Sequence, residues 1–584
     1  MGDCEPMGHW PTDREFNPGA VGEAGAGGLL YKGKTLLSGV DPSGRADRIA
    51  DAVDVTDRTL YICPSPLYGY GLERLLARIG RARDSALLCL EAEPELFVLS
   101  LEAFADKLNT NPRFRFAPRP VDEEVCMLVR REWGLRSFTT VRTIRLNGGW
   151  QLHPALYESL ERTLQKEIAL EWSNAMTLTR LGRRYIRNAL RNLALIPESP
   201  SLNGLSFGRA PVLVLGAGPS LDGTLDALSA HFGKTLRNTE GRPFRIVCVD
   251  TCLPALRARG IMPDLAVILE SQHWNLEDFI GLSDWKIPVA MDLSSLPRSG
   301  DVLSGGRHLF FTPWTELRLF DRLKAAGLLP ETLPPLGSVG LNAVAIALLL
   351  SSGTVITAGL DFSFTLDLSH SRSSPGHKTR LRRQNRFTGL LNADAAFGAA
   401  VFATTSKMGK KVFSSPALFN YRDLFEREFY DFGCSPPQLF DIVGNGLALG
   451  IKALSTEAVF DILSATGQTA AKTRRVDNND AALAAFAEQL RAFARVERER
   501  LLLLRGMLTG NTDMDHDALD TLIDECDYLW AHFPECAYNS RRPPREELES
   551  GSAAAVSFLK RVRAEIDPFY ELWGHGSSER ARIA

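Results

Sequence analysis

The stretch Val212–Leu228, VLVLGAGPSLDGTLDAL, decides the fold of this chain. Apolar residues come first, a Gly-Ala-Gly-Pro-Ser bend follows, and leucines at helical spacing complete the segment. This order predicts a buried strand that turns directly into a helix, with Ser220 placed to cap the helix. Glycines at such a bend allow a phosphate to approach the backbone N–H groups at the helix start.

The bend matches neither of the two common phosphate loops. No Gly-Lys-Ser/Thr follows it, as a P-loop requires, and Leu221 stands where the dinucleotide fingerprint has its third glycine. The segment therefore suits a nucleoside mono- or diphosphate, and a tight turn without a ligand is the alternative. The residues proposed to hold the phosphate are Gly216, Ala217, Gly218, Pro219 and Ser220.

Strands and helices alternate from Pro211 to about Tyr430. The segments PVLVLG, RIVCVD, DLAVILE and TVITAGLDF are continuously apolar and lie between helical patterns. Such strands predict a parallel sheet covered on both faces, that is, an α/β fold with a central Rossmann-like, doubly wound sheet. Ligands bind beyond the carboxyl ends of strands in these sheets. The polar residues expected at these ends are Gly216–Ser220, Asp250–Thr251, Glu270–Gln272 and Gly359–Asp361.

A chain of 584 residues is too long for one core, and its composition divides it into parts. We expect a disordered tail over residues 1–28, which lack the layout of a secretory signal. An N-terminal α/β domain over 29–175, a central Rossmann-like domain over 176–435 and a helical C-terminal domain over 436–584 follow. The last of these contains long amphipathic helices.

The N-terminal domain contains a second strand–loop–helix–strand unit. Its loop contains Gly69 and Gly71, and its second strand ends at Glu91 and Glu93. Such a unit can bind a nucleotide ribose, although this one lacks the complete glycine pattern. The alternative is an α/β scaffold without a ligand.

Composition excludes several classes of function. The net charge of −3 offers no basic field for nucleic acid. The longest apolar stretch, Val339–Leu350, is about half of the ~20 residues that a membrane span needs. Nine scattered cysteines without metal-ligand spacing indicate reduced thiols in a cytoplasmic protein, and no metal site is expected.

Two histidines lie close together in a polar segment after the last of these strands. His370 stands in LSHSRSS and His377 in SPGHKTR. An imidazole titrates near neutral pH and suits a general base, with His370 the first candidate and His377 the second. The neighbouring basic residues, Arg372 among them, suit an anionic ligand. The alternative is a solvated basic loop with two histidines that have no chemical role.

Besides GAGPSL, three segments carry a family pattern: YKGKTLLSGVDPSGRADRIA, VCVDTCLPALRARGIMPDLAVILESQHWN and GSVGLNAVAIALLLSSGTVITAGLDFSFTLDLSHSRSS. Together these segments resemble the motility-associated factor (Maf) glycosyltransferases, which share a domain with archaeal hydroxymethylpterin diphosphokinases. The GAGPSL stretch is also similar to a signature of bacterial sialyltransferases. The resemblance covers roughly residues 30–430, and the chain departs from the common pattern at Glu270 and Leu360.

The resemblance implies an enzyme that transfers a nonulosonic, sialic-acid-like sugar from its CMP-activated form to Ser or Thr of flagellin, for flagellum assembly and motility. No cofactor is implied, and flagellin and the CMP-sugar are the implied partners. The bend would cradle the nucleotide, and Asp361 would orient the donor or the base. The other implied binding residues are Asp250, Thr251, Glu270, Gln272, Ser338, Asn342, Gly359 and Arg372.

Two other functions stay open at this point. The same fold supports pyrophosphoryl transfer from ATP to a hydroxymethylpterin, with Mg²⁺ held by Asp250, Asp264 and Glu270. A protein that binds a nucleotide sugar or flagellin without catalysis is the third possibility.

Overall fold

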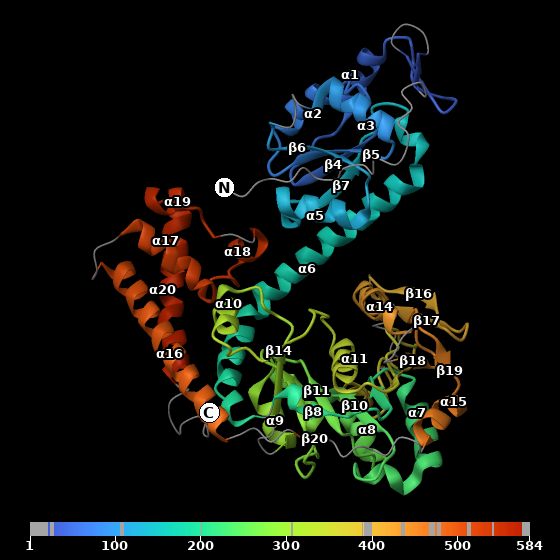
Figure 1. Ribbon diagram of the computed structural model, residues 1–584, viewed down its shortest axis with the longest axis vertical. Helices are drawn as coiled ribbons and strands as arrows, with labels where there is room; N and C mark the ends of the chain where they lie inside the picture. The colour runs from blue at the N-terminus through green and yellow to red at the C-terminus, as the bar shows by residue number, and fades with distance from the viewer. Residues whose placement is uncertain are drawn as a thin grey trace. The chain divides into compact units, whose positions relative to one another are not determined.

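The computed structural model divides the chain into two compact units (Figure 1). Unit 1 comprises Met1–Arg180 and Ala531–Pro544, and unit 2 comprises Leu181–Trp530 and Arg545–Ala584. The structure describes residues 21–23, 28–105, 110–199, 201–304, 308–387, 389, 400–433, 438–465, 474–475, 480–510, 515–539 and 542–574.

Most of the tail expected to be disordered, residues 1–28, lies outside the described residues. Within it, Val21–Glu23 form strand β1, which pairs antiparallel with β2 (Leu29–Tyr31). Strand β2 also pairs antiparallel with β3 (Lys34–Leu37). The described part of the tail is therefore an edge strand of a small sheet rather than disordered chain.

Unit 1 contains the expected N-terminal α/β sheet. Its four parallel strands have the order β6-β5-β4-β7. Alternate residues of β4 face opposite sides, because Leu60 belongs to one apolar cluster and Tyr61 to another. The strands are β4 (Thr59–Pro64), β5 (Ala86–Glu91), β6 (Phe114–Pro118) and β7 (Thr140–Thr143). The main helices are α1 (Pro42–Ala52), α2 (Leu72–Ile79), α3 (Pro94–Ser100), α5 (Asp122–Glu132) and α6 (Pro154–Leu193).

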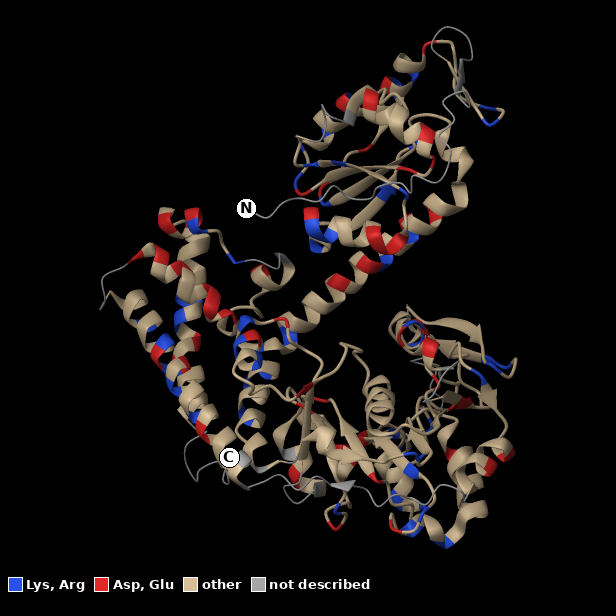
Figure 2. Ribbon diagram, viewed as in Figure 1, with Lys and Arg blue, Asp and Glu red and all other residues tan. Residues whose placement is uncertain are grey.

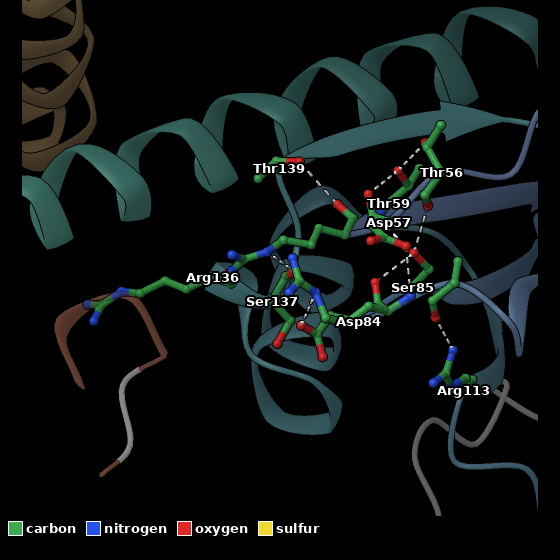
Figure 3. Close-up of polar contacts among 12 residues, drawn as sticks. Thr56, Asp57, Thr59, Asp84, Ser85, Arg113, Arg136, Ser137 and Thr139 are labelled. Carbon is green, nitrogen blue, oxygen red and sulfur yellow. Dashed lines mark hydrogen bonds and ion pairs between the residues drawn. The ribbon is translucent and has the colours of Figure 1, made fainter. Parts of the chain in front are cut away.

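Polar side chains at the amino ends of these strands bond to their own unit (Figure 3). The Thr59 N–H donates to Ser85 Oγ at 3.1 Å, and Ser85 Oγ donates to Thr56 O at 2.9 Å. The Arg58 guanidinium donates to Arg136 O at 2.7 Å. These hydrogen bonds join the segments at the amino ends of the strands, so the polar side chains there have a structural role.

The groups that suggested a ribose site in unit 1 are also engaged within the chain. Glu91 is fully buried and accepts from Ser65 Oγ at 2.6 Å and from the Glu93 N–H at 3.0 Å. Burial raises the pKa of Glu91 to about 7. Gly69 and Gly71 have positive φ, and a Cβ on either would collide with the unit's own chain. These contacts favour the scaffold interpretation over a ribose site.

Unit 2 contains the expected Rossmann-like sheet. It has nine strands in the order β14-β13-β12-β11-β10-β9-β15-β18-β19, and every pair is parallel. The central strands are buried along their whole length, as their apolar sequences require. The strands are β9 (Val212–Leu215), β10 (Arg245–Val249), β11 (Leu265–Ile268), β12 (Val289–Asp292), β13 (His308–Thr312), β14 (Glu331–Thr332), β15 (Val355–Ala358), β18 (Leu439–Ile442) and β19 (Ala453–Leu454).

The direction of chain progression reverses at one place in this sheet. From β9 the chain adds strands outward to β14, and it then returns to place β15 on the other side of β9. Open α/β sheets bind ligands outside the carboxyl ends of strands at such a switch point. Gly216 follows β9 and Gly359 follows β15, so the bend singled out in the sequence lies at the switch point. The helices near it are α7 (Leu221–Phe232), α11 (Val339–Leu350), α12 (Pro375–Arg383) and α14 (Pro416–Phe429).

The C-terminal helices do not form a separate compact unit. Helices α16 (Asp480–Thr509), α17 (His516–Glu525) and α20 (Ala553–Gly574) belong to unit 2, where both acidic and basic residues follow their length (Figure 2). Glu497 of α16 is fully buried and accepts two 3.0 Å bonds from Arg322 of α10 (Arg318–Ala325). Residues 531–544 belong to unit 1 instead. This division differs from the domain limits expected at 175/176 and 435/436, since α6 continues through the first of them.

The length and apolarity of the helices decide whether one of them could cross a membrane. Among the described residues, no helix is both long and apolar enough to span a bilayer.

Candidate functional site

The glycines of the bend allow two strand ends to approach closely. A Cβ on Gly216 would lie 2.6 Å from Gly359 O, and a Cβ on Gly218 would lie 2.7 Å from the same oxygen. The Gly216 N–H donates to Ala358 O and the Gly218 N–H to Gly359 O, both at 2.8 Å. The chain after β9 is thereby hydrogen-bonded to the chain after β15. Glycine is required here by packing.

Ser220 and Asp361 form a tight pair at the start of α7. Asp361 accepts from the Ser220 N–H at 2.7 Å and from Ser220 Oγ at 2.6 Å. The Ser220 hydroxyl makes no capping bond to the helix, although the residue occupies the N-cap position. Burial raises the pKa of the Asp361 carboxyl. Asp361 therefore fixes the bend.

These contacts also correct the expected phosphate cradle. The N–H groups of Gly216, Gly218 and Ser220 donate to the protein itself, and Pro219 has no N–H. Four of the five residues expected to cradle a phosphate therefore do not offer it a backbone N–H.

The basic segment after β15, residues 369–383, lies directly on the bend. The Ser371 N–H donates to Ala217 O at 3.0 Å, and the Arg372 N–H donates to Asp222 Oδ2, in the first turn of α7, at 2.8 Å. Ser374 caps α12 by accepting from the His377 N–H at 3.3 Å. The structure thus brings together two motifs that are about 150 residues apart in the chain.

Five buried polar atoms around the bend have no hydrogen-bond partner in the described part of the chain. Three belong to the basic segment, one to α11 and one to the loop after β18: Ser371 Oγ, His377 Nδ1, Arg380 Nη1, Asn342 Oδ1 and Asn445 Oδ1. Buried polar atoms in folded proteins nearly always have partners. Three of the residues contribute an O–H or N–H group, and two contribute amide oxygens. The arrangement suits a ligand that has an anionic group and hydroxyl or amino groups.

Glycine contacts place the two asparagines at the same edge of the sheet. A Cβ on Gly444 would lie 3.3 Å from Ser220 Cβ, and a Cβ on Gly446 would lie 2.6 Å from Asp361 Cα, so Asn445 lies beside this pair. A Cβ on Gly340, at the start of α11, would lie 2.6 Å from Leu360 Cδ2, just after β15. Asn342 is fully buried in the first turns of the same helix, where Nδ2 donates to Ser338 O at 2.9 Å.

The two candidate histidines have different environments. His370 is exposed, and its Nδ1 lies 3.3 Å from Ser369 Oγ, which also accepts from Arg380 Nη2 at 2.9 Å. Desolvation within the loop, and then the charge of Arg380, lower the pKa of His370. His377 is 7% exposed, and burial followed by the charges of Arg380 and Arg372 lowers its pKa. Both imidazoles are therefore neutral near pH 7 and able to accept a proton.

The remaining predicted residues lie along the same edge toward β11. Asp250 is buried and accepts from the Thr251 N–H at 2.9 Å and from Asn275 Nδ2 at 2.7 Å. Burial raises its pKa to about 6. Thr251, Glu270 and Gln272 are half-buried, and the Gln272 N–H donates to Glu270 Oε1 at 2.8 Å. Asp250 therefore has a structural role, whereas its three neighbours are accessible to a ligand.

The carboxylates proposed for Mg²⁺ do not meet. Asp264 precedes β11, whereas Asp250 follows β10 and Glu270 follows β11, so Asp264 lies at the opposite edge of the sheet. It is buried and paired with Arg242 and Arg245. Within the described ranges, no group of three or more metal-ligating side chains is present.

Sequence reasoning singled out two of the five residues with unpartnered atoms, His377 and Asn342. Arg380 is one of several basic residues near the histidines that suit an anionic ligand, and the sequence does not distinguish it from its neighbours. Ser371 had no signal of its own beside His370. Asn445 lies beyond residue 435, where the central domain was expected to end, and only the order of β15 and β18 brings it to the bend.

Comparisons with known proteins agree with this architecture. The family model "6-hydroxymethylpterin diphosphokinase MptE-like" matches residues 184–367, which include the bend and the switch point. The structure of a Maf glycosyltransferase from Magnetospirillum magneticum AMB-1 superposes with a TM-score of 0.51 at 13% identity, covering 97% of this chain and 93% of that one. The chain has the Maf glycosyltransferase fold.

Relatives in sequence are found in Treponema pallidum (strain Nichols). One uncharacterized protein is 29% identical over 564 residues, which cover 93% of each chain. A second uncharacterized protein is 28% identical over 123 residues, or 19% of this chain and 52% of that one. The expected Maf-like architecture thus extends beyond the MptE-like domain to almost the whole chain.

Proposed function

We propose that the protein is a glycosyltransferase that transfers a nonulosonic acid from its CMP-activated form to Ser or Thr hydroxyls of flagellin in the cytoplasm. The five unpartnered buried atoms at the switch point support it best, because they suit a nucleotide that has both a phosphate and hydroxyl or amino groups. The likeness in fold to a Maf glycosyltransferase supports the same class of reaction. The donor and the acceptor follow from the motif resemblance.

In this proposal the basic segment binds the donor phosphate. Arg380 Nη1 and Ser371 Oγ donate to the phosphate oxygens, and a bond to a charged group of this kind is worth about 1.5–3 kcal/mol. His377 lies on the same helix as Arg380, and its Nδ1 also has no partner among the described residues. The amide oxygens of Asn342 and Asn445 accept from the ribose hydroxyls or the cytosine amino group.

His370 is proposed as the general base, because its exposed imidazole can meet a protein acceptor. The acceptor oxygen bonds to the anomeric carbon of the sugar, and the bond from that carbon to the phosphate oxygen breaks. The electron pair of the broken bond stays on CMP, and the hydroxyl proton moves to the imidazole. In the proposal the Arg380 charge stabilises the leaving phosphate.

Calorimetric titration with CMP tests the binding step. The Arg380→Ala variant is compared with Arg383→Ala, which removes an exposed arginine from the same helix. We expect Arg380→Ala to weaken CMP binding by about 10- to 100-fold, and the control to bind as the wild type does. Absence of CMP binding by the wild type, or equal effects of the two substitutions, would overturn the proposal.

The mass of intact flagellin tests the transfer step. Flagellin from cells with His370→Ala should lose the mass of the sugar, while cells with an exposed control, His273→Ala, should retain it. If the wild-type protein binds CMP but flagellin from the same cells is unmodified, the result would instead support a binding protein without catalysis.

Pyrophosphoryl transfer to a pterin is the second candidate, because the matching family model is named for that activity. The separation of Asp264 from Asp250 and Glu270 argues against the Mg²⁺ site expected for it. Consumption of hydroxymethylpterin that depends on ATP would favour this candidate over glycosyl transfer.

A further inference from the structure

Two aromatic side chains gather at the carboxyl edge of β11–β13, and a third lies nearby on α14. Tyr185 of α6 and Trp314, which follows β13, are half-buried, and their ring centroids are 6.1 Å apart at 65°. Tyr421 of α14 is also half-buried, and its ring lies 3.3 Å from the position of a Cβ on Gly337. Gly337 directly precedes Ser338, which was predicted to be at the binding edge.

Acidic groups lie among these rings. Burial raises the pKa of Tyr185 to about 12, and the charges of Glu270 and Asp292 and the nearby Tyr421 add to this effect. Glu270 follows β11 and Asp292 ends β12, so both belong to the carboxyl edge of the sheet. We call Tyr185, Trp314, Tyr421 and Glu270 the aromatic rim.

Helix α6 is fixed over this edge. Asn188 Nδ2 donates to Ser271 O at 3.1 Å and to Ser294 O at 3.0 Å, and Tyr185 lies one helical turn earlier. Ser271 is 2% exposed, stands between Glu270 and Gln272, and has no partner for Oγ among the described residues. The edge therefore holds a further buried polar atom that is not bonded within the protein.

The chemistry of the rim differs from that of the basic segment. Phenol and carboxylate oxygens bind hydroxyl groups, and aromatic faces pack against the C–H groups of a sugar. The Glu270 and Asp292 charges repel a phosphate or a sugar carboxylate. The β9–β15 switch point and the point between β11 and β12 are three strand spacings apart, a separation of about 14 Å. A nucleoside monophosphate joined to a nine-carbon sugar can reach across that distance.

We infer that the aromatic rim binds the polyhydroxylated chain of the donor sugar, while the phosphate and the sugar carboxylate bind at the basic segment. The inference rests on the proposed function and adds the direction in which the donor lies across the sheet. Tyr185 and Glu270 bond to the sugar hydroxyls, and Tyr421 and Trp314 pack against the carbon chain. The rim distinguishes a sugar with a hydroxylated chain from CMP alone.

Paired calorimetric titrations with CMP and CMP-N-acetylneuraminic acid test the inference. We expect the wild type to bind the CMP-sugar more tightly than CMP. Tyr185→Phe and Glu270→Gln should each weaken binding of the CMP-sugar by about 3- to 10-fold and leave CMP binding unchanged. Both changes preserve shape, and the amide introduced by Glu270→Gln keeps an oxygen to accept from the Gln272 N–H. Tyr430→Phe, at a tyrosine that is 60% exposed, is the matched control.

The outcomes separate this inference from the proposed function. Equal binding of the two ligands by the wild type, or CMP-sugar binding that Tyr185→Phe and Glu270→Gln do not weaken, overturns the inference and leaves the CMP site intact. Loss of both ligands in these variants overturns it too, since the rim would then hold the nucleotide. A wild type that binds neither ligand overturns both proposals.

Discussion

Gly216→Ala separates two roles that a glycine can have in the bend: it can let a second strand end approach, or it can let a phosphate approach. An added Cβ would lie 2.5 Å from Leu360 Cδ2 and 2.6 Å from Gly359 O. Leu360 is buried, and Gly359 O already accepts from the Gly218 N–H, so neither atom has room to move. Overpacking of this kind costs about 1–3 kcal/mol, and weakening of the hydrogen bond adds about 1 kcal/mol. We expect the free energy of unfolding of unit 2 to fall by about 2–4 kcal/mol.

Hydrogen exchange in increasing urea, read from peptides of β9 and β15, measures this loss for unit 2 separately from unit 1. Gly223→Ala, in the first turn of α7, is the control, because a Cβ there meets no atom within 4 Å and alanine favours a helix over glycine by up to about 1 kcal/mol. CMP titration runs in parallel at a temperature where both variants are folded. A Gly216→Ala protein with wild-type stability that no longer binds CMP would refute the packing argument and restore the bend as a phosphate cradle.

Two further predictions concern buried charges. Burial raises the pKa of Glu91 to about 7, so the folded state favours the protonated carboxyl. The contribution of Glu91 to the free energy of unfolding is therefore full below pH 4.5 and is lost as the pH rises through 7. Glu91→Gln should therefore raise the melting temperature of unit 1 at pH 8.5, by a gain of up to about 3 kcal/mol, and not at pH 4; equal effects at both pH values would contradict this. Arg322→Ala removes two bonds from buried Glu497, which keeps a 2.6 Å bond from Arg500, and should lower the free energy of unfolding by about 1.5–3 kcal/mol. Arg491→Ala, in an exposed pair, should lower it much less, and equal losses in thermal unfolding would contradict the reasoning.

The fold was largely predictable because its signals are local. The continuous apolar run Val212–Leu215 indicates a buried strand, and the leucines of α7 recur at helical spacing. Strands β10, β11 and β15 have the same continuous apolar character. The extent of the sheet was less accessible. Strand β18 (Leu439–Ile442) lies beyond the expected end of the central domain, and the two residues of β14 are too few to give a pattern. The assignment of residues 531–544 to unit 1 depends on tertiary contacts that no local pattern records.

The candidate site was predictable in position more than in role. A glycine that lets a phosphate approach and a glycine that lets a second strand end approach give the same sequence pattern. For Gly216 and Gly218 the partner is the chain at Gly359, which lies about 140 residues away in the sequence. Asp361 was correctly expected at the end of its strand, but a carboxylate that fixes a bend and one that contacts a substrate look alike until Ser220 is seen beside it.

The unpartnered atoms carry the strongest physical argument for a ligand at the bend. A buried polar atom without a partner costs about 1–3 kcal/mol, so five of them cost about as much as the net stability of a whole domain. The backbone of the bend shows no such shortage, because the amides of Gly216, Gly218 and Ser220 all have partners in the chain. At the bend the cost therefore falls on side chains of α11, the basic segment and the loop after β18. Water or a polar ligand must offset it, and the mixture of donors with amide oxygens fits a nucleotide better than a simple anion.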